Sequence, residues 1–87
     1  SNQPYNAQSH KKVMISVTEN ESEEEVAETL VSKKLIYGKA RFVIRKYFSK
    51  YKKNSFLPGR YEFTQSQGMD DIMGILCGDH VSEEIIQ

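Results

Sequence analysis

Two runs of acidic side chains are the part of this sequence that could do chemistry. Residues 23–25 are all glutamate, and Asp70 is followed by a second aspartate. Neighbouring carboxylates can serve general acid–base catalysis. However, Ser22 and Glu25 have the Ser-x-x-Glu spacing of a helix capping box, and acids are favoured at the positive end of a helix dipole. We therefore interpret both runs as helix starts and expect no catalytic carboxylate.

The thiol and the imidazoles do not suggest an active site either. Cys77 is the single cysteine, so it can form no internal disulfide, and without clustered partners it cannot anchor zinc. The sequence places no nucleophile beside His10 or His80. It also lacks the phosphate-binding glycine loops, the HExxH zinc motif and the GxSxG nucleophile motif. We expect a chain that is not an enzyme and needs no metal or cofactor.

Five elements are predicted around these residues, in an α+β fold. A chain of 87 residues buries only about 60% of its unfolded surface, which is enough for one core. Alternating apolar residues predict strands over 12–18 and 61–64. Helices are predicted from residue 23, from residue 40 and over 69–77. The residues expected to face the core from the first strand and the first and third helices are Val13, Ile15, Val17, Val26, Ala27, Leu30, Val31, Ile72, Ile75 and Leu76.

The domain boundaries follow from where the periodicity begins and stops. Residues 1–11 are polar and aperiodic, which predicts a disordered leader or the remnant of a cleaved tag. Residues 12–78 form the predicted domain, and residues 79–87 form a C-terminal tail without an assigned element. Apolar stretches are far shorter than the roughly 20 residues that span a bilayer, so the sequence itself contains no predicted membrane anchor.

The second helix has the clearest periodicity. A stripe at helical spacing predicts its buried face, which comprises Ala40, Val43, Ile44, Tyr47, Phe48 and Tyr51. Such a stripe is expected to pack on the core before it serves as a ligand platform. Phe42 points away from the stripe, so we expect another element or a partner to cover it.

Positive charge is concentrated in the same region. The 12 basic and 12 acidic residues cancel overall, but no acid occurs between Lys33 and Arg60. The predicted basic face comprises Arg41, Arg45, Lys46, Lys50, Lys52 and Lys53. It could be a solvated flank attracted to the acidic first helix, or a contact for an anionic polymer or membrane surface. Nucleic acid is not favoured, because no helix-turn-helix spacing or aromatic RNA-binding strand is present.

The order of these elements, together with several motifs, resembles a known family. The similarity is to the LysM-like N-terminal module of the endolytic murein transglycosylase family, also called MltG or YceG-like, and covers roughly residues 12–78. Its sharpest part is Gly59-x-Tyr61 followed by Met69. The segments that carry the resemblance are Glu19–Ser22, Lys34–Ile36, Phe42, Leu57–Phe63 and Met69–Gly78.

The resemblance implies a β-α-α-β unit with an additional C-terminal helix. A glycan groove would lie between the first strand-to-helix turn and the loop before the second strand. Its candidate residues are Thr18, Glu19, Asn20, Asn54, Ser55, Leu57 and Arg60. The family's usual Pro-Glu-Gly turn is replaced here by residues 19–21, Glu-Asn-Glu.

The resemblance also implies a location and a role. It suggests a bacterial protein at the extracytoplasmic face of the cell membrane, anchored by a helix upstream, with peptidoglycan as its polymer. The family's catalytic glutamate lies in a following domain, so no glutamate of this chain inherits that role. We expect a non-catalytic module that binds peptidoglycan or docks onto the cell-wall machinery. The alternative is an interaction domain that uses the basic second helix on nucleic acid or an anionic membrane.

Overall fold

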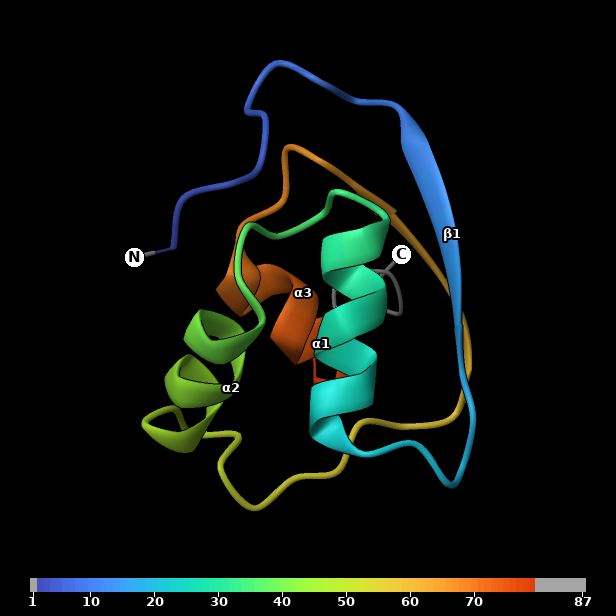
Figure 1. The fold of residues 1–87 in the computed structure, drawn as a ribbon, viewed down its shortest axis with the longest axis vertical. Helices are drawn as coiled ribbons and strands as arrows, with labels where there is room; N and C mark the ends of the chain where they lie inside the picture. The colour runs from blue at the N-terminus through green and yellow to red at the C-terminus, as the bar shows by residue number, and fades with distance from the viewer. Residues whose placement is uncertain (1, 80–87) are drawn as a thin grey trace, which may run out of the picture.

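Two strands and three helices make up the computed structural model, which describes residues 2–79 (Figure 1). In chain order they are β1 (Lys12–Val17), α1 (Glu23–Ser32), α2 (Lys39–Tyr47), β2 (Gly59–Thr64) and α3 (Met69–Leu76). This arrangement confirms the predicted α+β class and the β-α-α-β order followed by a helix. Only Asp79 of the C-terminal tail expected over 79–87 is among the described residues.

The two strands pair antiparallel, with Val13 opposite Phe63 and Val17 opposite Gly59. Because side chains alternate along a strand, Ile15, Val17 and Phe63 share the face that packs on the helices, and all three are buried. β2 begins two residues earlier than predicted. Gly59 begins it with φ of 152°, a conformation that side chains disfavour. The Pro58-Gly59 pair is typical of a turn, so the sequence does not indicate that the strand already starts at Gly59.

The start of α1 is the capping box that the sequence predicts. The Glu25 backbone N–H donates to Ser22 Oγ at 3.1 Å, and the Ser22 N–H donates to Glu25 Oε1 at 2.8 Å. Val26, Ala27 and Leu30 are buried along one side of the helix. The glutamates at 23–25 therefore have a structural explanation at the helix start.

The end of α1 is a Schellman motif with an unfavourable residue in it. The Leu35 N–H donates to the Leu30 carbonyl and the Lys34 N–H to the Val31 carbonyl, each at 2.9 Å. Lys34 adopts φ of 61°, a left-handed conformation in which a side chain is strained.

Lys34→Gly is therefore expected to stabilise the domain by about 1 kcal/mol, since glycine removes the side-chain strain at this position. For a domain of this size that corresponds to a rise in Tm of about 4–8 °C. Thermal unfolding followed by circular dichroism measures it, with Lys33→Gly as the control, because Lys33 has negative φ. A Tm for Lys34→Gly at or below that of the parent would contradict the assignment.

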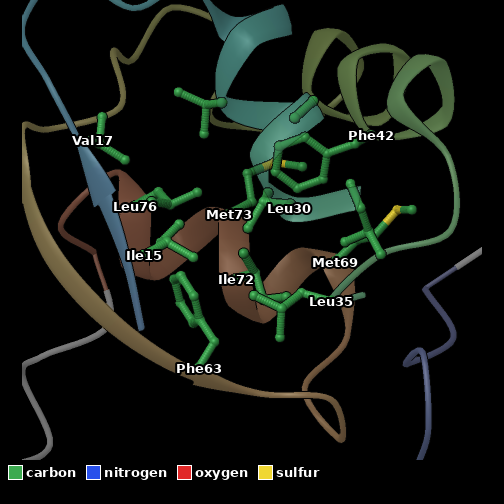
Figure 2. Packing of buried hydrophobic residues seen from close by; sticks show 13 residues of the cluster. Ile15, Val17, Leu30, Leu35, Phe42, Phe63, Met69, Ile72, Met73 and Leu76 are labelled. Atoms are coloured by element: carbon green, nitrogen blue, oxygen red, sulfur yellow. The ribbon is translucent and has the colours of Figure 1, made fainter. Parts of the chain in front are cut away.

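α2 presents the opposite side to the core from the one predicted. Phe42 is fully buried, whereas Ile44 is 57% exposed and Phe48 is 80% exposed. Figure 2 shows the Phe42 ring pointing in among the core side chains near Met73 and Leu30. The physical reason is that one large ring fills the space under α2, where it also approaches Phe56 at 5.9 Å between centroids. Val43 of the predicted stripe does pack against the core, but the prediction that Tyr47 and the 40/44/48 stripe are buried is wrong.

α2 is also shorter than the periodicity suggests. The helix ends at Tyr47, and Ser49 accepts the Tyr51 backbone N–H on its hydroxyl at 3.0 Å. Tyr51 therefore lies in a turn and packs against the edge of the core from there. Tyr51 fits the apolar spacing in the sequence, but it lies beyond the end of the helix.

α3 fills the space between the sheet and the other helices (Figure 2). Ile72 and Leu76 are buried, as predicted, while Ile75 is only partly covered. Met69 and Met73 are buried as well.

No helix within residues 2–79 is long and apolar enough to cross a bilayer.

Residues 2–11 make specific contacts, unlike the disordered leader that was expected. Tyr5 stacks on Tyr37 with centroids 4.3 Å apart. Asn2 Oδ1 accepts the Asp70 backbone N–H at 2.7 Å, at the first turn of α3. The physical reason for the difference is that aromatic stacking and helix capping need no periodicity in the segment that supplies them.

Candidate functional site

The turn after β1 and the loop before β2 lie side by side at one end of the sheet. The pairing of Val17 with Gly59 places Thr18, which follows β1, next to Pro58, which precedes β2. In Figure 1 the loop before β2 passes below the start of α1 and continues upward beside β1. The fold thus brings together the two segments between which the glycan groove was predicted.

Hydrogen bonds hold the backbone of both segments while leaving the predicted contact side chains exposed. Glu21 Oε1 accepts the Thr18 N–H at 2.9 Å, which closes the turn after β1. In the loop, the Leu57 N–H donates to the Leu76 carbonyl at 2.8 Å, and the Tyr61 hydroxyl donates to the Leu57 carbonyl. Within residues 2–79, no side-chain hydrogen bond occupies the predicted contact residues Thr18, Glu19, Asn20, Asn54 and Ser55. These side chains are available to a ligand.

Arg60 is separated from the other candidates. It pairs with Ser16 and alternates with the inward-facing Tyr61 and Phe63, so its side chain belongs to the outer face of the sheet. Leu57 remains at the loop, with 46% of its surface exposed. The register therefore places Thr18 beside the loop before β2 and sets Arg60 apart; Glu19 and Asn20 lie in the turn, and Asn54, Ser55 and Leu57 lie in the loop.

Lys46 does not belong to the predicted basic face. It is 1% exposed, and its ammonium lies 2.6 Å from the Glu23 carboxylate. The same ammonium donates to the Asn54 carbonyl at 2.6 Å and to the Lys52 carbonyl at 3.3 Å. The correction has a physical reason: once Phe42 turns inward, the residue one helical turn later must turn inward too, and a buried cation requires such partners.

Ion pairs neutralise two more of the predicted cations. The Arg45 guanidinium holds both oxygens of Asp70, at 2.6 and 2.9 Å. This contact lowers the pKa of the Asp70 carboxyl and raises that of Arg45. Lys50 lies 3.3 Å from Asp79. Arg41, Lys52 and Lys53 form no ion pair within the described residues, so the free positive charge is smaller than the sequence suggests.

A second surface, missed by the sequence analysis, lies on the outer side of α2. A groove of 1010 Å³ runs beside the exposed stripe of that helix. It is lined by Tyr37, Gly38, Lys39, Ala40, Arg41, Ile44, Arg45, Phe48, Ser49 and Asp70. The available signal was Phe42: a large apolar residue off the stripe indicates that a helix has two candidate buried faces.

The described residues form no metal-binding cluster and no activated thiol. Residues 2–79 contain no cluster of His, Cys, Asp and Glu that could hold a metal ion. Burial raises the pKa of the Cys77 thiol, which disfavours the reactive thiolate.

Searches against models of protein families, curated proteins and solved structures find no match to this chain.

Proposed function

We propose that this chain is a non-catalytic module of a bacterial cell-envelope protein, which positions that protein on peptidoglycan at the extracytoplasmic face of the cell membrane. The observation that carries the proposal is the adjacency of the turn after β1 and the loop before β2. The same two segments would form the glycan groove of the LysM-like module that the sequence resembles. The proposal needs no catalytic group.

The exposed side chains suit a glycan ligand in their chemistry. Asn20 and Asn54 each carry an amide donor and acceptor, and Thr18 and Ser55 each carry a hydroxyl. Sugar hydroxyls and N-acetyl groups present matching donors and acceptors. Leu57, partly exposed in the same loop, offers an apolar surface to an N-acetyl methyl group. A ligand lying across the turn and the loop could contact both at once.

Retention on purified peptidoglycan tests this function. The double substitution Asn20→Ala with Asn54→Ala removes two amides and is expected to weaken binding by about tenfold, as the loss of one or two neutral hydrogen bonds would. Pull-down over a range of peptidoglycan amounts measures the change. Because the interaction is not primarily electrostatic, retention should survive a rise in salt.

A matched charge control separates specific binding from electrostatic adsorption. Arg41→Glu with Lys12→Glu reverses two exposed charges, one in the first turn of α2 and one at the end of the sheet opposite the turn, whereas substituting the buried Lys46 would disturb the fold. The charge variant is expected to retain full binding. If neither variant changes retention, or if the parent is not retained at any salt concentration, the proposed function is wrong.

A further inference from the structure

The outer side of α2 exposes large apolar side chains that have no cover among the described residues. Ala40, Ile44 and Phe48 are spaced by four residues, so they form one column along the helix. Ile44 and Phe48 are 57% and 80% exposed, and the adjacent Tyr47 is 56% exposed. The Tyr47 and Phe48 rings meet edge to face with centroids 5.0 Å apart. An exposed apolar patch of this kind indicates an interaction site.

Unpaired cations border this patch. Arg41 lines the groove together with Ile44 and Phe48, and Lys52 follows the end of the helix. Neither forms an ion pair within residues 2–79. The Lys52 ammonium lies 4.1 Å from the centroid of the Tyr47 ring. The face therefore combines protruding aromatic groups with positive charge that the fold leaves available.

The groove beside the column supplies polar groups next to this apolar surface. Arg41, Ser49 and Tyr37 line it together with Ile44 and Phe48. An anionic headgroup could reach the Arg41 guanidinium while the apolar side chains enter the boundary with the acyl chains; the Tyr37 and Ser49 hydroxyls already donate to the Tyr5 and Lys46 carbonyls. Aromatic groups favour that interface, and lysine and arginine near a membrane are attracted to anionic lipids.

From this arrangement we propose that the α2 face rests on a membrane surface that contains anionic phospholipid. Phe48 and Ile44 enter the interfacial layer, and Arg41 and Lys52 contact lipid phosphates. A membrane fits better than an acidic protein segment, because Phe48 protrudes at the end of α2 with cations on both sides of it in the chain, and a fluid surface needs no matching shape. None of Arg41, Ile44, Phe48 and Lys52 is among the residues proposed to contact the glycan.

A single tryptophan can report the contact, since the chain has none. Phe48→Trp is expected to show a blue-shifted emission, and quenching by brominated lipid, with vesicles of equal parts phosphatidylglycerol and phosphatidylcholine. Vesicles of phosphatidylcholine alone should give neither change. Met14→Trp is the matched control, because Met14 is exposed on β1 on the outer face of the sheet. Equal shifts in the two variants, or no shift in either, would overturn the proposal.

Charge reversal tests the cations separately. Arg41→Glu with Lys52→Glu is expected to lower co-sedimentation with the phosphatidylglycerol vesicles by tenfold or more. Lys11→Glu with Lys12→Glu makes the same change in net charge at exposed positions elsewhere and should lower it far less. Circular dichroism verifies the fold of each variant. Equal losses of co-sedimentation in the two double variants would mean that binding depends only on net charge, and would contradict a defined membrane-binding face.

The competing occupants give different results. A second copy of the chain on this face would produce a concentration-dependent dimer in sedimentation, abolished by Phe48→Ser, without vesicle binding. An acidic protein partner would leave the isolated chain monomeric and unbound to every vesicle. Either result overturns the membrane proposal, and neither bears on retention by peptidoglycan.

Discussion

Phe42→Ala is expected to lower the free energy of unfolding by about 3–5 kcal/mol, the usual cost of removing a buried phenyl ring. The ring is fully buried and packs where α2 meets the core (Figure 2). Total stabilities of domains are commonly only about 5–15 kcal/mol, so the variant could unfold. Phe42→Leu keeps most of the apolar volume and is expected to remain folded with a smaller loss. Urea unfolding followed by circular dichroism measures both.

Ile44→Ala is the matched control, because it shortens a large apolar side chain on the other side of the same helix. It should change the free energy of unfolding by no more than about 0.5 kcal/mol, as for other surface substitutions. Alanine also has a higher helix propensity than isoleucine, which offsets part of any loss. A larger cost for Ile44→Ala than for Phe42→Leu would show that the 40/44/48 stripe is the buried one.

Lys46→Ala is expected to cost about 2–4 kcal/mol, since it removes a buried side chain and leaves the Asn54 carbonyl without its charged donor. Lys46→Met keeps the apolar stem and should cost less, about 1–3 kcal/mol, from the lost hydrogen bonds to the two carbonyls and the lost contact with Glu23. Lys50, whose side chain is 76% exposed in its pair with Asp79, is the control. Lys50→Ala should cost less than about 1 kcal/mol.

A double-mutant cycle identifies the partner of Lys46. Glu23→Gln combined with Lys46→Met should show a coupling free energy of about 0.5–3 kcal/mol, as for groups in direct contact. Chemical denaturation of the parent, the two single variants and the double variant measures it. Additive effects would mean that the ammonium and the carboxylate do not interact in solution, and equal costs for Lys46→Ala and Lys50→Ala would place Lys46 at the surface.

Local patterns predicted the parts of the fold that depend on neighbouring residues. The Ser22 and Glu25 cap needs only a separation of three residues, and the alternation of β1 needs only its own side chains. The orientation of α2 could not be obtained in this way. It depends on the space left by α1 and α3 and on Phe56 in a later loop, whereas the apolar spacing records residue types along one helix only.

The candidate site was likewise predictable only in part. The family resemblance pointed to the turn after β1 and the loop before β2, and antiparallel pairing of the strands brings these segments together. The register was needed to see that Arg60 belongs to the outer face of the sheet. The burial of Lys46 follows from the orientation of α2. Because the buried side of α2 was predicted wrongly, Lys46 was also wrongly placed on the basic face.

The contacts of Lys46 also bear on how a ligand would be received. Its ammonium joins the start of α1, through Glu23, to the backbone of residues 52–54. In the glycan site proposed above, Glu23 follows the turn on one side and residues 52–54 begin the loop on the other, so this one cation would set the separation of the two segments before a ligand arrives. Such preorganisation reduces the conformational entropy lost on binding, and loosening this single tie would weaken affinity without removing any contact to the ligand.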